Sequence, residues 1–180
     1  MIAIRAAGES DLATIFEIIN DSARAYKGVI PDEAWHEPYM PMDHLQAEIG
    51  KGVRFYCCDL DGVTMGVMGI QDVKDVTLVR HAYVRTESRA QGIGRALLEA
   101  VSRLTSRPIL IGAWKAAGWA IGFYQKNGFT LLPEDEKNRL LKIYWTISNF
   151  QVEQSVVLAE RRWLERQTTG AVAALGSAGT

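Results

Sequence analysis

The sequence predicts a mixed α/β domain in which helices flank a mostly antiparallel sheet with one parallel pair of strands. Three observations predict this fold class. An apolar, β-branched run over residues 76–84 leads through a polar loop into an amphipathic run that begins at Gly92, which is the order strand, loop, helix. A second apolar run, Ile109–Ala113, fits a buried strand parallel to the first. The earlier apolar segments over 53–73 are separated by turn residues, as in an antiparallel meander.

The first part of the chain is predicted to form a strand and a helix that packs on the sheet. Residues 2–5 are the strand, and Ser10 can cap the helix that follows. The apolar positions at helical spacing are Leu12, Ile15, Phe16 and Ile19. After Ser22 this pattern breaks.

A long loop rich in aromatic residues and proline follows over residues 23–42. It contains Tyr26, Trp35 and Tyr39. Loops of this length in compact domains are usually functional or packed as lids. An irregular covering loop without a functional role is the equal alternative.

The meander is predicted from turn signals. A short helix over 43–49 is closed by glycines, and strands over 53–59 and 63–73 are joined by the hairpin pair Asp61-Gly62. Lys74-Asp75 turns the chain into the strand over 76–84.

The second half alternates helices and strands. A helix over 92–105 ends before Pro108, and a right-handed crossover then leads to the strand Ile109–Ala113. A helix over 119–127 is followed by Gly128, which suits the left-handed position after a helix end. The remaining expected elements are a strand over 129–132, a helix after Pro133 with Leu140 and Leu141 in its apolar stripe, a strand over 154–158 and a helix over 160–167. We expect one domain over 1–163 and a C-terminal tail over 164–180, which from 168 onward is rich in Ala and Gly and has no pattern.

Composition narrows the function. The 180 residues are 48% hydrophobic with a net charge of −1, so the chain is neither disordered nor an obligate nucleic-acid binder. No apolar stretch is long enough to span a membrane, and the chain opens on a strand rather than a signal peptide. The adjacent Cys57 and Cys58 point to opposite faces of a strand and cannot bridge, which fits a reducing cytoplasm. Three scattered histidines make no metal site, so we expect no metal.

The junction at Gly92 and Gly94 has the properties of an anion cradle. A helix start leaves backbone N–H groups without partners and carries partial positive charge. The two glycines leave the backbone uncovered, and Arg89 and Arg95 add positive charge. The alternative is a glycine-softened turn into an ordinary helix, because a short Gly-x-Gly pattern is weak by itself.

Two sequence blocks together resemble the GCN5-related N-acetyltransferase (GNAT) family. The first is Arg89-x-x-Gly92-x-Gly94, which resembles the family's acetyl-CoA loop, and the second is the segment 120–129, which resembles its later helix and Gly-Phe exit. The resemblance covers residues 1–162. It implies a GNAT-like sheet splayed between the two parallel strands, and acetyl-CoA-dependent transfer of an acetyl group to a primary amine by direct attack. A non-catalytic sensor that binds CoA or acyl-CoA is the alternative.

The resemblance also implies site residues. The end of the strand before the loop would bond to the pantetheine arm of acetyl-CoA through Ala82, Tyr83 and Val84. The turn would hold the pyrophosphate through the backbone N–H groups of Gln91, Gly92, Ile93, Gly94 and Arg95, with Arg89 on its flank. Tyr124 occupies the family's usual tyrosine position and would protonate the leaving thiolate, since the ordinary pKa of tyrosine is near 10; a packing tyrosine is the alternative. Ala117 stands where the family often has a cofactor-binding asparagine, which puts that contact in doubt.

The general base and the acceptor stay open. His81 lies on the strand before the loop, although a core or surface histidine is the simpler interpretation. Trp35, Tyr26 and Phe16 are candidates for the wall of an acceptor pocket, with core packing as the equal alternative. We expect a small-molecule or peptide amine as partner, no nucleic acid and no membrane. A homodimer is expected by analogy alone.

Overall fold

A computed structural model of the protein describes residues 1–177, and of residues 170–177 only the backbone. The chain forms two compact units. The first contains residues 1–73 and 78–106, and the second contains residues 74–77 together with the chain from 107 onward. Each unit is described by itself.

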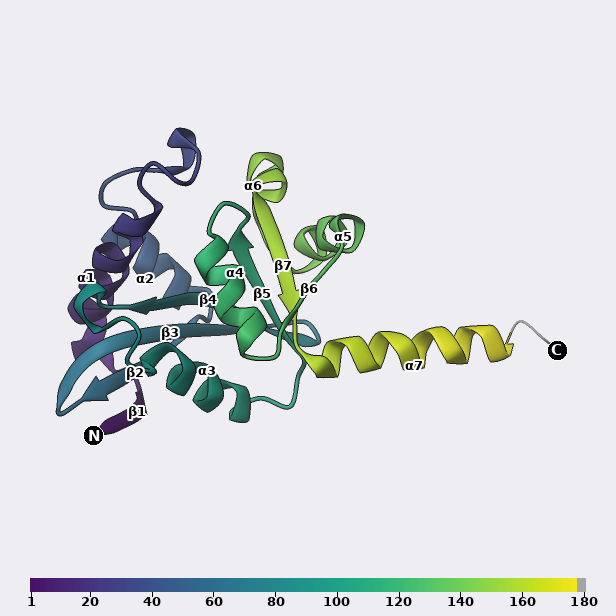
Figure 1. Ribbon diagram of the computed structural model, residues 1–180, viewed down its shortest axis with the longest axis horizontal. Coiled ribbons are helices and arrows are strands. Elements are labelled where there is room, and N and C mark those ends of the chain that lie inside the picture. The colour runs from purple at the N-terminus through teal and green to yellow at the C-terminus, as the bar shows by residue number, and fades with distance from the viewer. Residues whose placement is uncertain (178–180) are drawn as a thin grey trace. The chain divides into compact units, whose positions relative to one another are not determined.

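Four strands make the sheet of the first unit (Figure 1), in the order β1 (Ile2–Ala6), β2 (Arg54–Leu60), β3 (Val63–Val73) and β4 (Val76–Val84). The pairs β1–β2 and β2–β3 are antiparallel, so the expected meander is present. Asp61 and Gly62 both have positive φ, 50° and 83°. These values are those of the two-residue hairpin turn that an Asp-Gly pair predicts.

Three helices belong to the first unit: α1 (Leu12–Ala23), α2 (Met42–Gly50) and α3 (Ile93–Arg103). The expected cap at Ser10 is wrong. Ser10 lies inside a short 3₁₀ turn, η1 (Glu9–Asp11), and Asp11 occupies the N-cap position of α1. The Asp11 carboxylate accepts a hydrogen bond from Gly8 N at 2.7 Å. It thereby satisfies a backbone N–H group of the segment that leads into the helix.

The core of the first unit lies where α1 and α2 cover the sheet. It contains buried apolar side chains from both helices, from β2 and β3, and from the residues that precede α2 and β2, namely Ile15, Ile18, Ile19, Met40, Leu45, Val53, Phe55, Cys57 and Val67. Successive side chains of a strand face opposite sides. The residues of β3 that face away from this core therefore meet α3, which packs directly on Gly66.

The second unit contains β5 (Ile109–Trp114), β7 (Ser155–Ala159) and β6 (Thr130–Leu131), in that order and with antiparallel pairing. The first residues of β4 also belong here, and Thr77 N donates to Pro108 O at 3.0 Å just before β5. β4 and β5 are thus neighbours in strand order, as expected for the parallel pair. The predicted fold class, mixed α/β with a mostly antiparallel sheet flanked by helices, is confirmed, while the splay between these strands stays a prediction.

The helices of the second unit are α4 (Gly118–Lys126), α5 (Glu134–Tyr144), α6 (Asn149–Gln154) and α7 (Arg161–Ser177). The sequence analysis missed α6. Its signal is present, because Ser148 and Gln151 form a capping box in which Gln151 N donates to Ser148 Oγ at 3.2 Å. Helix α7 continues through residues 168–177, which composition predicts to lack regular structure; residues 178–180 lie outside the described chain. The single domain over 1–163 stays a prediction.

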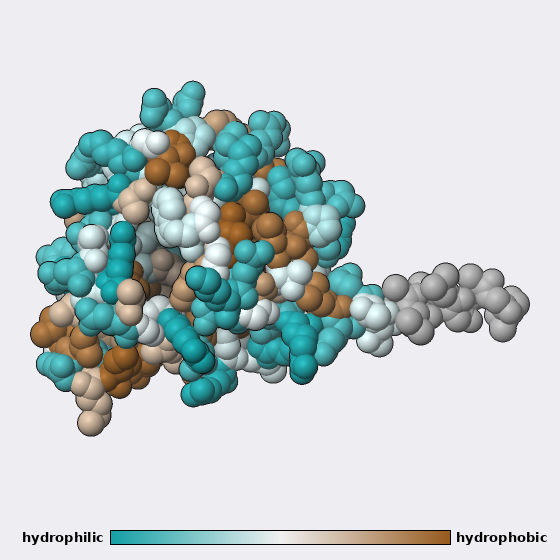
Figure 2. Space-filling model, in the orientation of Figure 1, coloured by the Kyte–Doolittle hydropathy of each residue, from teal (hydrophilic) through white to brown (hydrophobic). Residues whose placement is uncertain are grey.

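Other expectations concern single features. Cys57 and Cys58 are both buried and unbridged. Among the described residues, no group of three His, Cys, Asp or Glu is placed to hold a metal ion, and no helix has the length and apolarity to cross a bilayer. On the face seen in Figure 2, hydrophilic side chains cover most of the surface and apolar ones form small groups.

Candidate active site

The turn between β4 and α3 belongs wholly to the first unit and is shaped by two left-handed residues. Arg85 N donates to Met65 O at 2.8 Å where β4 ends, and a 3₁₀ turn, η4 (Thr86–Ser88), follows. Ala90 has φ 62° and Gly92 has φ 80°. A left-handed alanine costs roughly 1–2 kcal/mol relative to the right-handed form, so this turn is held against a local preference.

The first backbone N–H groups of α3 lack acceptors inside the helix. Ala96 N is the donor that closes the first helical turn, to Gly92 O at 2.9 Å. The N–H groups of Ile93, Gly94 and Arg95 therefore have no acceptor inside the helix. Gly92 is exposed, and a Cβ built on it would meet nothing within 4 Å, so the space in front of the turn is open. The arrangement suits an anion such as a phosphate.

Helix α1 holds the turn in place. Asp21 Oδ2 accepts a hydrogen bond from Thr86 N at 2.7 Å, and Arg89 donates to Ser22 O at 3.1 Å. The N–H group of Thr86 lowers the pKa of Asp21, because it stabilises the charged carboxylate. The sequence analysis missed Asp21. An acidic residue in the last turn of a helix is unfavourable for the helix dipole, and this is the signal that marks it.

The two arginines that flank the turn contact protein groups in this structure. Arg89 reaches the carbonyl of Ser22 on α1. Arg95 extends along α3 and donates to Glu99 Oε1 at 2.7 Å, which lowers the pKa of Glu99. Both arginine side chains are exposed, so an incoming anion competes only with exposed contacts.

The last residues of β4 lie against an aromatic cluster. Ala82, Tyr83 and Val84 are half-buried. The ring of Tyr83 meets that of Tyr26 edge-on, with centroids 6.5 Å apart. Burial raises the pKa of Tyr26 to about 12, helped by the nearby Tyr39 and opposed by a hydrogen bond with Tyr83. The Tyr26 hydroxyl group is therefore neutral at physiological pH.

A pocket of about 570 Å³ opens between α1 and the loop over 23–42; it is the candidate for the acceptor site, and we refer to it as the acceptor pocket for that reason alone. Phe16, Trp35 and Tyr39 supply its aromatic surfaces, and the Trp35 and Tyr39 rings stack at 5.7 Å with 24° between their planes. Its charged lining residues are Glu17, Asp21, Glu37, Arg24 and Arg85. Arg85 is the residue directly after β4, so this pocket adjoins the strand that leads to the turn.

The expected wall residues have different positions. Trp35 and Phe16 line the acceptor pocket, and Phe16 also packs against the core of the first unit. Tyr26 is not among the lining residues, but its ring lies 5.4 Å from that of Tyr39. The two alternatives given for these residues, pocket wall and core packing, thus both apply to Phe16.

His81 is held by structural contacts. Its Nε2 lies 3.4 Å from Glu48 Oε2, and its ring stacks on Phe55 with centroids 5.7 Å apart. Arg80 Nη2 donates to the same carboxylate oxygen at 2.8 Å. These contacts favour the interpretation of His81 as a packed histidine that fixes α2 to β4.

Tyr124 and Ala117 belong to the second unit. Tyr124 is 7% exposed on α4, with ring contacts to Phe123 at 5.1 Å and Phe129 at 6.1 Å. Ala117 is fully buried at the N-cap of α4. Gly128 has φ 87° after the helix end, as its position predicts. The structure gathers residues 82–95 in the first unit; the roles assigned to them and to Tyr124 stay predictions.

Comparisons with known proteins agree with the resemblance found in the sequence. Residues 51–131 match the model of the acetyltransferase (GNAT) domain. A search of curated protein sequences finds no significant match. Among solved structures, a PaiA N-acetyltransferase from Thermoplasma acidophilum in complex with coenzyme A has a TM-score of 0.66 at 19% identity, over 89% of this chain and 98% of that one.

Two further structures share the fold. A GNAT-family acetyltransferase from Staphylococcus aureus Mu50 has a TM-score of 0.66 at 16% identity, over 89% of this chain and 98% of that one. The ribosomal-protein-S18-alanine N-acetyltransferase of Escherichia coli has a TM-score of 0.60 at 16% identity, over 89% and 93%. At these identities the structures show a common fold, and they do not identify the acceptor.

Proposed function

We propose that this chain, of which residues 51–131 match the GNAT acetyltransferase domain, transfers an acetyl group from acetyl-CoA to the primary amine of a small molecule or peptide. The observation that carries the proposal is the turn at Gly92, where a Cβ would meet nothing within 4 Å and the first N–H groups of α3 have no acceptor inside the helix. A diphosphate is the part of acetyl-CoA that such a turn recognises. A structure with coenzyme A bound to a protein of the same fold supports the choice of carrier.

The proposed carrier site extends from β4 to α3. Gln91, Gly92, Ile93, Gly94 and Arg95 hold the pyrophosphate through their backbone N–H groups, with Arg89 beside it. Ala82, Tyr83 and Val84 offer backbone groups at the end of β4 to the amides of the pantetheine arm. The contacts from α1 to Thr86 and Arg89 support this proposal, because they fix the turn before any ligand arrives.

The proposed reaction is a direct attack. The amine nitrogen bonds to the thioester carbonyl carbon, the C–S bond breaks, and the amine loses a proton to solvent or a base. The thiolate of CoA takes a proton from the hydroxyl group of Tyr124, whose role is supported by its position four residues before Gly128. Alignment of the two substrates supplies most of the acceleration. A strand N–H that polarises the carbonyl adds to it.

The acceptor pocket favours a cationic amine. Its lining has three carboxylates and two guanidinium groups. Arg85 and Glu17 pair with each other at 3.4 Å. Glu37 pairs at 3.6 Å with the exposed Lys27, which does not line the pocket. The stacked rings of Trp35 and Tyr39 offer π faces that attract an ammonium group. The bound ammonium group must first lose a proton, because only the neutral amine can attack the thioester.

A reducing compartment such as the cytoplasm suits the protein, and two unbridged buried cysteines support this part of the proposal. The homodimer expected by analogy stays a prediction.

The test is the release of free CoA thiol from acetyl-CoA in the presence of single amines that carry neutral, anionic or additional cationic groups. We expect amine-dependent thiol release, with the highest kcat/KM for amines that carry no carboxylate. If the protein binds CoA and no amine yields thiol, the chain is a sensor and the proposal is wrong.

A matched pair of variants tests the acceptor pocket. Glu37 lines it and Glu33 is an exposed residue of the same loop outside its lining. Glu37→Gln should raise KM for the amine by about two- to fivefold, as expected for one exposed charge pair, with KM for acetyl-CoA unchanged. Glu33→Gln should change neither value. Equal effects of the two variants contradict this placement of the acceptor.

A further inference from the structure

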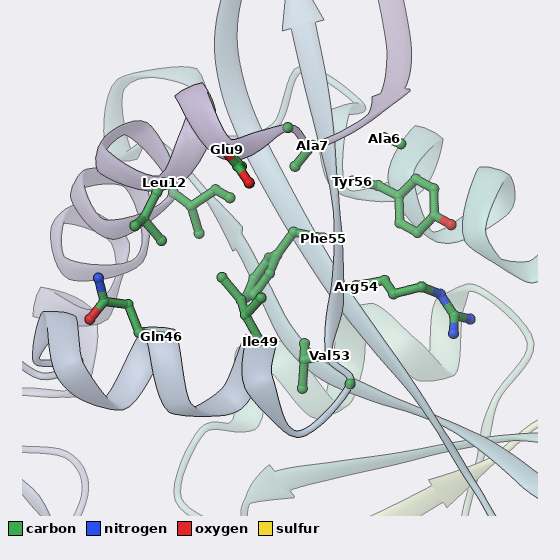
Figure 3. A pocket seen from close by; sticks show the side chains of 13 residues that line it. Ala6, Ala7, Glu9, Leu12, Gln46, Ile49, Val53, Arg54, Phe55 and Tyr56 are labelled. Carbon is green, nitrogen blue, oxygen red and sulfur yellow. The ribbon is translucent and has the colours of Figure 1, made fainter.

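The first unit contains a second cavity of about 700 Å³, which no part of the proposed reaction uses. It opens between the start of α1, the end of α2 and the start of β2 (Figure 3), and we call it the α1–α2 pocket. Its apolar surface comes from Leu12, Ile15, Ile49, Val53 and Phe55. Ile49 is 40% exposed, although it is a large apolar residue, because it lies at the mouth of this cavity.

The cavity has a clear origin in the fold. The last paired residues of β1 and β2 are Ala6 and Tyr56, and Ala7 N then donates to Phe55 O at 2.9 Å before the chain leaves the sheet for α1. The first residues of β2 extend beyond this point. Helices α1 and α2 cover most of Val53 and Phe55, which are 3% and 5% exposed, and the cavity opens beside them at the more exposed Ile49.

The charged group at the rim is acidic. Figure 3 shows the Glu9 carboxylate beside the apolar floor near Leu12, with the amide of Gln46 at the α2 side. Arg54 also lines the cavity, but its side chain is directed away from Leu12 and Ile49 and donates to Asp72 Oδ2 at 3.2 Å. A ligand on this floor therefore meets one negative charge and an amide.

We propose that the α1–α2 pocket binds a small amphiphilic cation: an ammonium group on an unbranched or lightly branched alkyl chain of about six to eight carbons. The volume is within the range of small-molecule sites. The alkyl chain lies on the floor formed by Leu12, Val53 and Phe55, and the ammonium group lies at Glu9 and Gln46. Each buried methylene strengthens binding by about fourfold.

The pocket is connected to β4. The Phe55 ring that forms its floor stacks on the ring of His81, with centroids 5.7 Å apart and 17° between their planes. Glu48, next to Ile49 on α2, contacts both Arg80 and His81. Of the side chains that hold His81, Phe55 lines the pocket and is the one that a bound molecule touches. Its binding alters the surroundings of His81.

The experiment is a calorimetric titration of the full chain, without acetyl-CoA, with n-octylamine, 1-octanol and octanoate. We expect saturable binding of n-octylamine that persists in Trp35→Ala, weaker binding of 1-octanol and no measurable binding of octanoate. Equal affinity for the three probes overturns the assignment of a cation, and the absence of saturable n-octylamine binding overturns the site.

Variants locate the site. Ile49→Trp fills the mouth and should abolish n-octylamine binding, whereas Ile143→Trp, at a similarly exposed isoleucine on α5, should leave it unchanged. Glu9→Gln should weaken binding by about two- to fivefold. Because n-octylamine is itself an amine, Trp35→Ala is the control for the acceptor pocket. Binding that is lost in Trp35→Ala and kept in Ile49→Trp overturns the proposal.

A spectroscopic signal gives a readout independent of catalysis. The ring-proton resonances of His81 should shift on titration with n-octylamine, because the stacked Phe55 ring contacts the ligand. His44, an exposed histidine outside the lining of both pockets, is the internal control and should not shift. Unchanged His81 resonances at saturation overturn the placement of the ligand on Phe55. If the protein binds n-octylamine in this pocket but transfers no acetyl group, the pocket assignment stands and the proposed function is wrong.

Discussion

Ile93 packs so closely on Gly66 that a Cβ on Gly66 would lie 2.6 Å from Ile93 Cγ2 and 3.2 Å from Leu97 Cδ1. Ile93 is the first residue of α3 and directly follows Gly92. The missing side chain on β3 therefore sets how near the start of α3 comes to the sheet, and with it the position of the N–H groups proposed to bind the diphosphate.

Gly66→Ala should destabilise the protein by about 1–3 kcal/mol, because an overpacked methyl group forces α3 away from β3. The affinity for CoA should fall as the turn moves. Gly50→Ala is the control, since a Cβ on Gly50 meets nothing within 4 Å. Urea unfolding and calorimetry measure the two effects. Unchanged values in Gly66→Ala contradict this role of the contact.

Asp21→Ala should loosen the turn, because Thr86 N loses its charged acceptor. We expect a loss of about 1 kcal/mol in the free energy of unfolding and weaker binding of CoA. Asp32→Ala, at an exposed residue of η3 (Asp32–Ala34), is the control for removing one negative charge. If both variants bind CoA equally well, Asp21 does not preorder the turn.

The Glu48 carboxylate gives a pH dependence. Its hydrogen bond with His81, together with the charge of Arg80, lowers the pKa of Glu48 from 4.5 to about 2. Since the folded pKa lies below the unfolded one, the stabilisation is complete above pH 4.5 and is lost as the pH falls toward 2. In that window the free energy of unfolding of the wild type should decrease more steeply than that of Glu48→Gln. Parallel curves from chemical unfolding contradict the expectation.

Gly94→Trp should abolish CoA binding without unfolding the chain, because an indole in the first turn of α3 obstructs the space in front of the N–H groups. Arg103→Trp, in the last turn of the same helix and exposed, is the matched control and should bind CoA normally. Circular dichroism verifies the fold of both variants. Normal affinity in Gly94→Trp refutes the placement of the diphosphate.

Tyr124→Phe should lower kcat by about 10²-fold, as expected for a lost general acid, and leave the affinity for CoA nearly unchanged. Tyr144→Phe is the control, because the Tyr144 hydroxyl group donates to Asp75 at 2.8 Å and has no proposed catalytic role. An unchanged kcat in Tyr124→Phe removes the acid role. A similar loss in both variants shows a structural effect.

Local patterns predicted most of the fold. The Asp61-Gly62 hairpin, the strand over 76–84 and the left-handed Gly128 each depend on turn chemistry or on short-range periodicity, which the sequence contains directly. Two local signals were missed although they were present: the capping box of Ser148 and Gln151, and the N-cap role of Asp11. The helical extent of α7 was also missed, because Ala-rich segments with little periodicity give no amphipathic pattern.

The contacts that hold the candidate site in place could not be predicted from local sequence patterns. The glycine pair indicated an open turn, but Asp21 and Thr86 are 65 residues apart, and only the fold brings them together. The same holds for Gly66 and Ile93, and for the stacking of Phe55 on His81. A long-range contact produces no periodic pattern in the sequence. From the sequence alone, Gly66 therefore cannot be distinguished from a glycine that merely weakens a strand.

The most direct measurement is the titration of the isotope-labelled protein with CoA, followed by the chemical shifts of its backbone amides. The account predicts that the largest shifts fall on Gln91 to Arg95, with further shifts at Ala82 to Val84. Large shifts confined to other parts of the chain, with those five amides unmoved at saturation, contradict it.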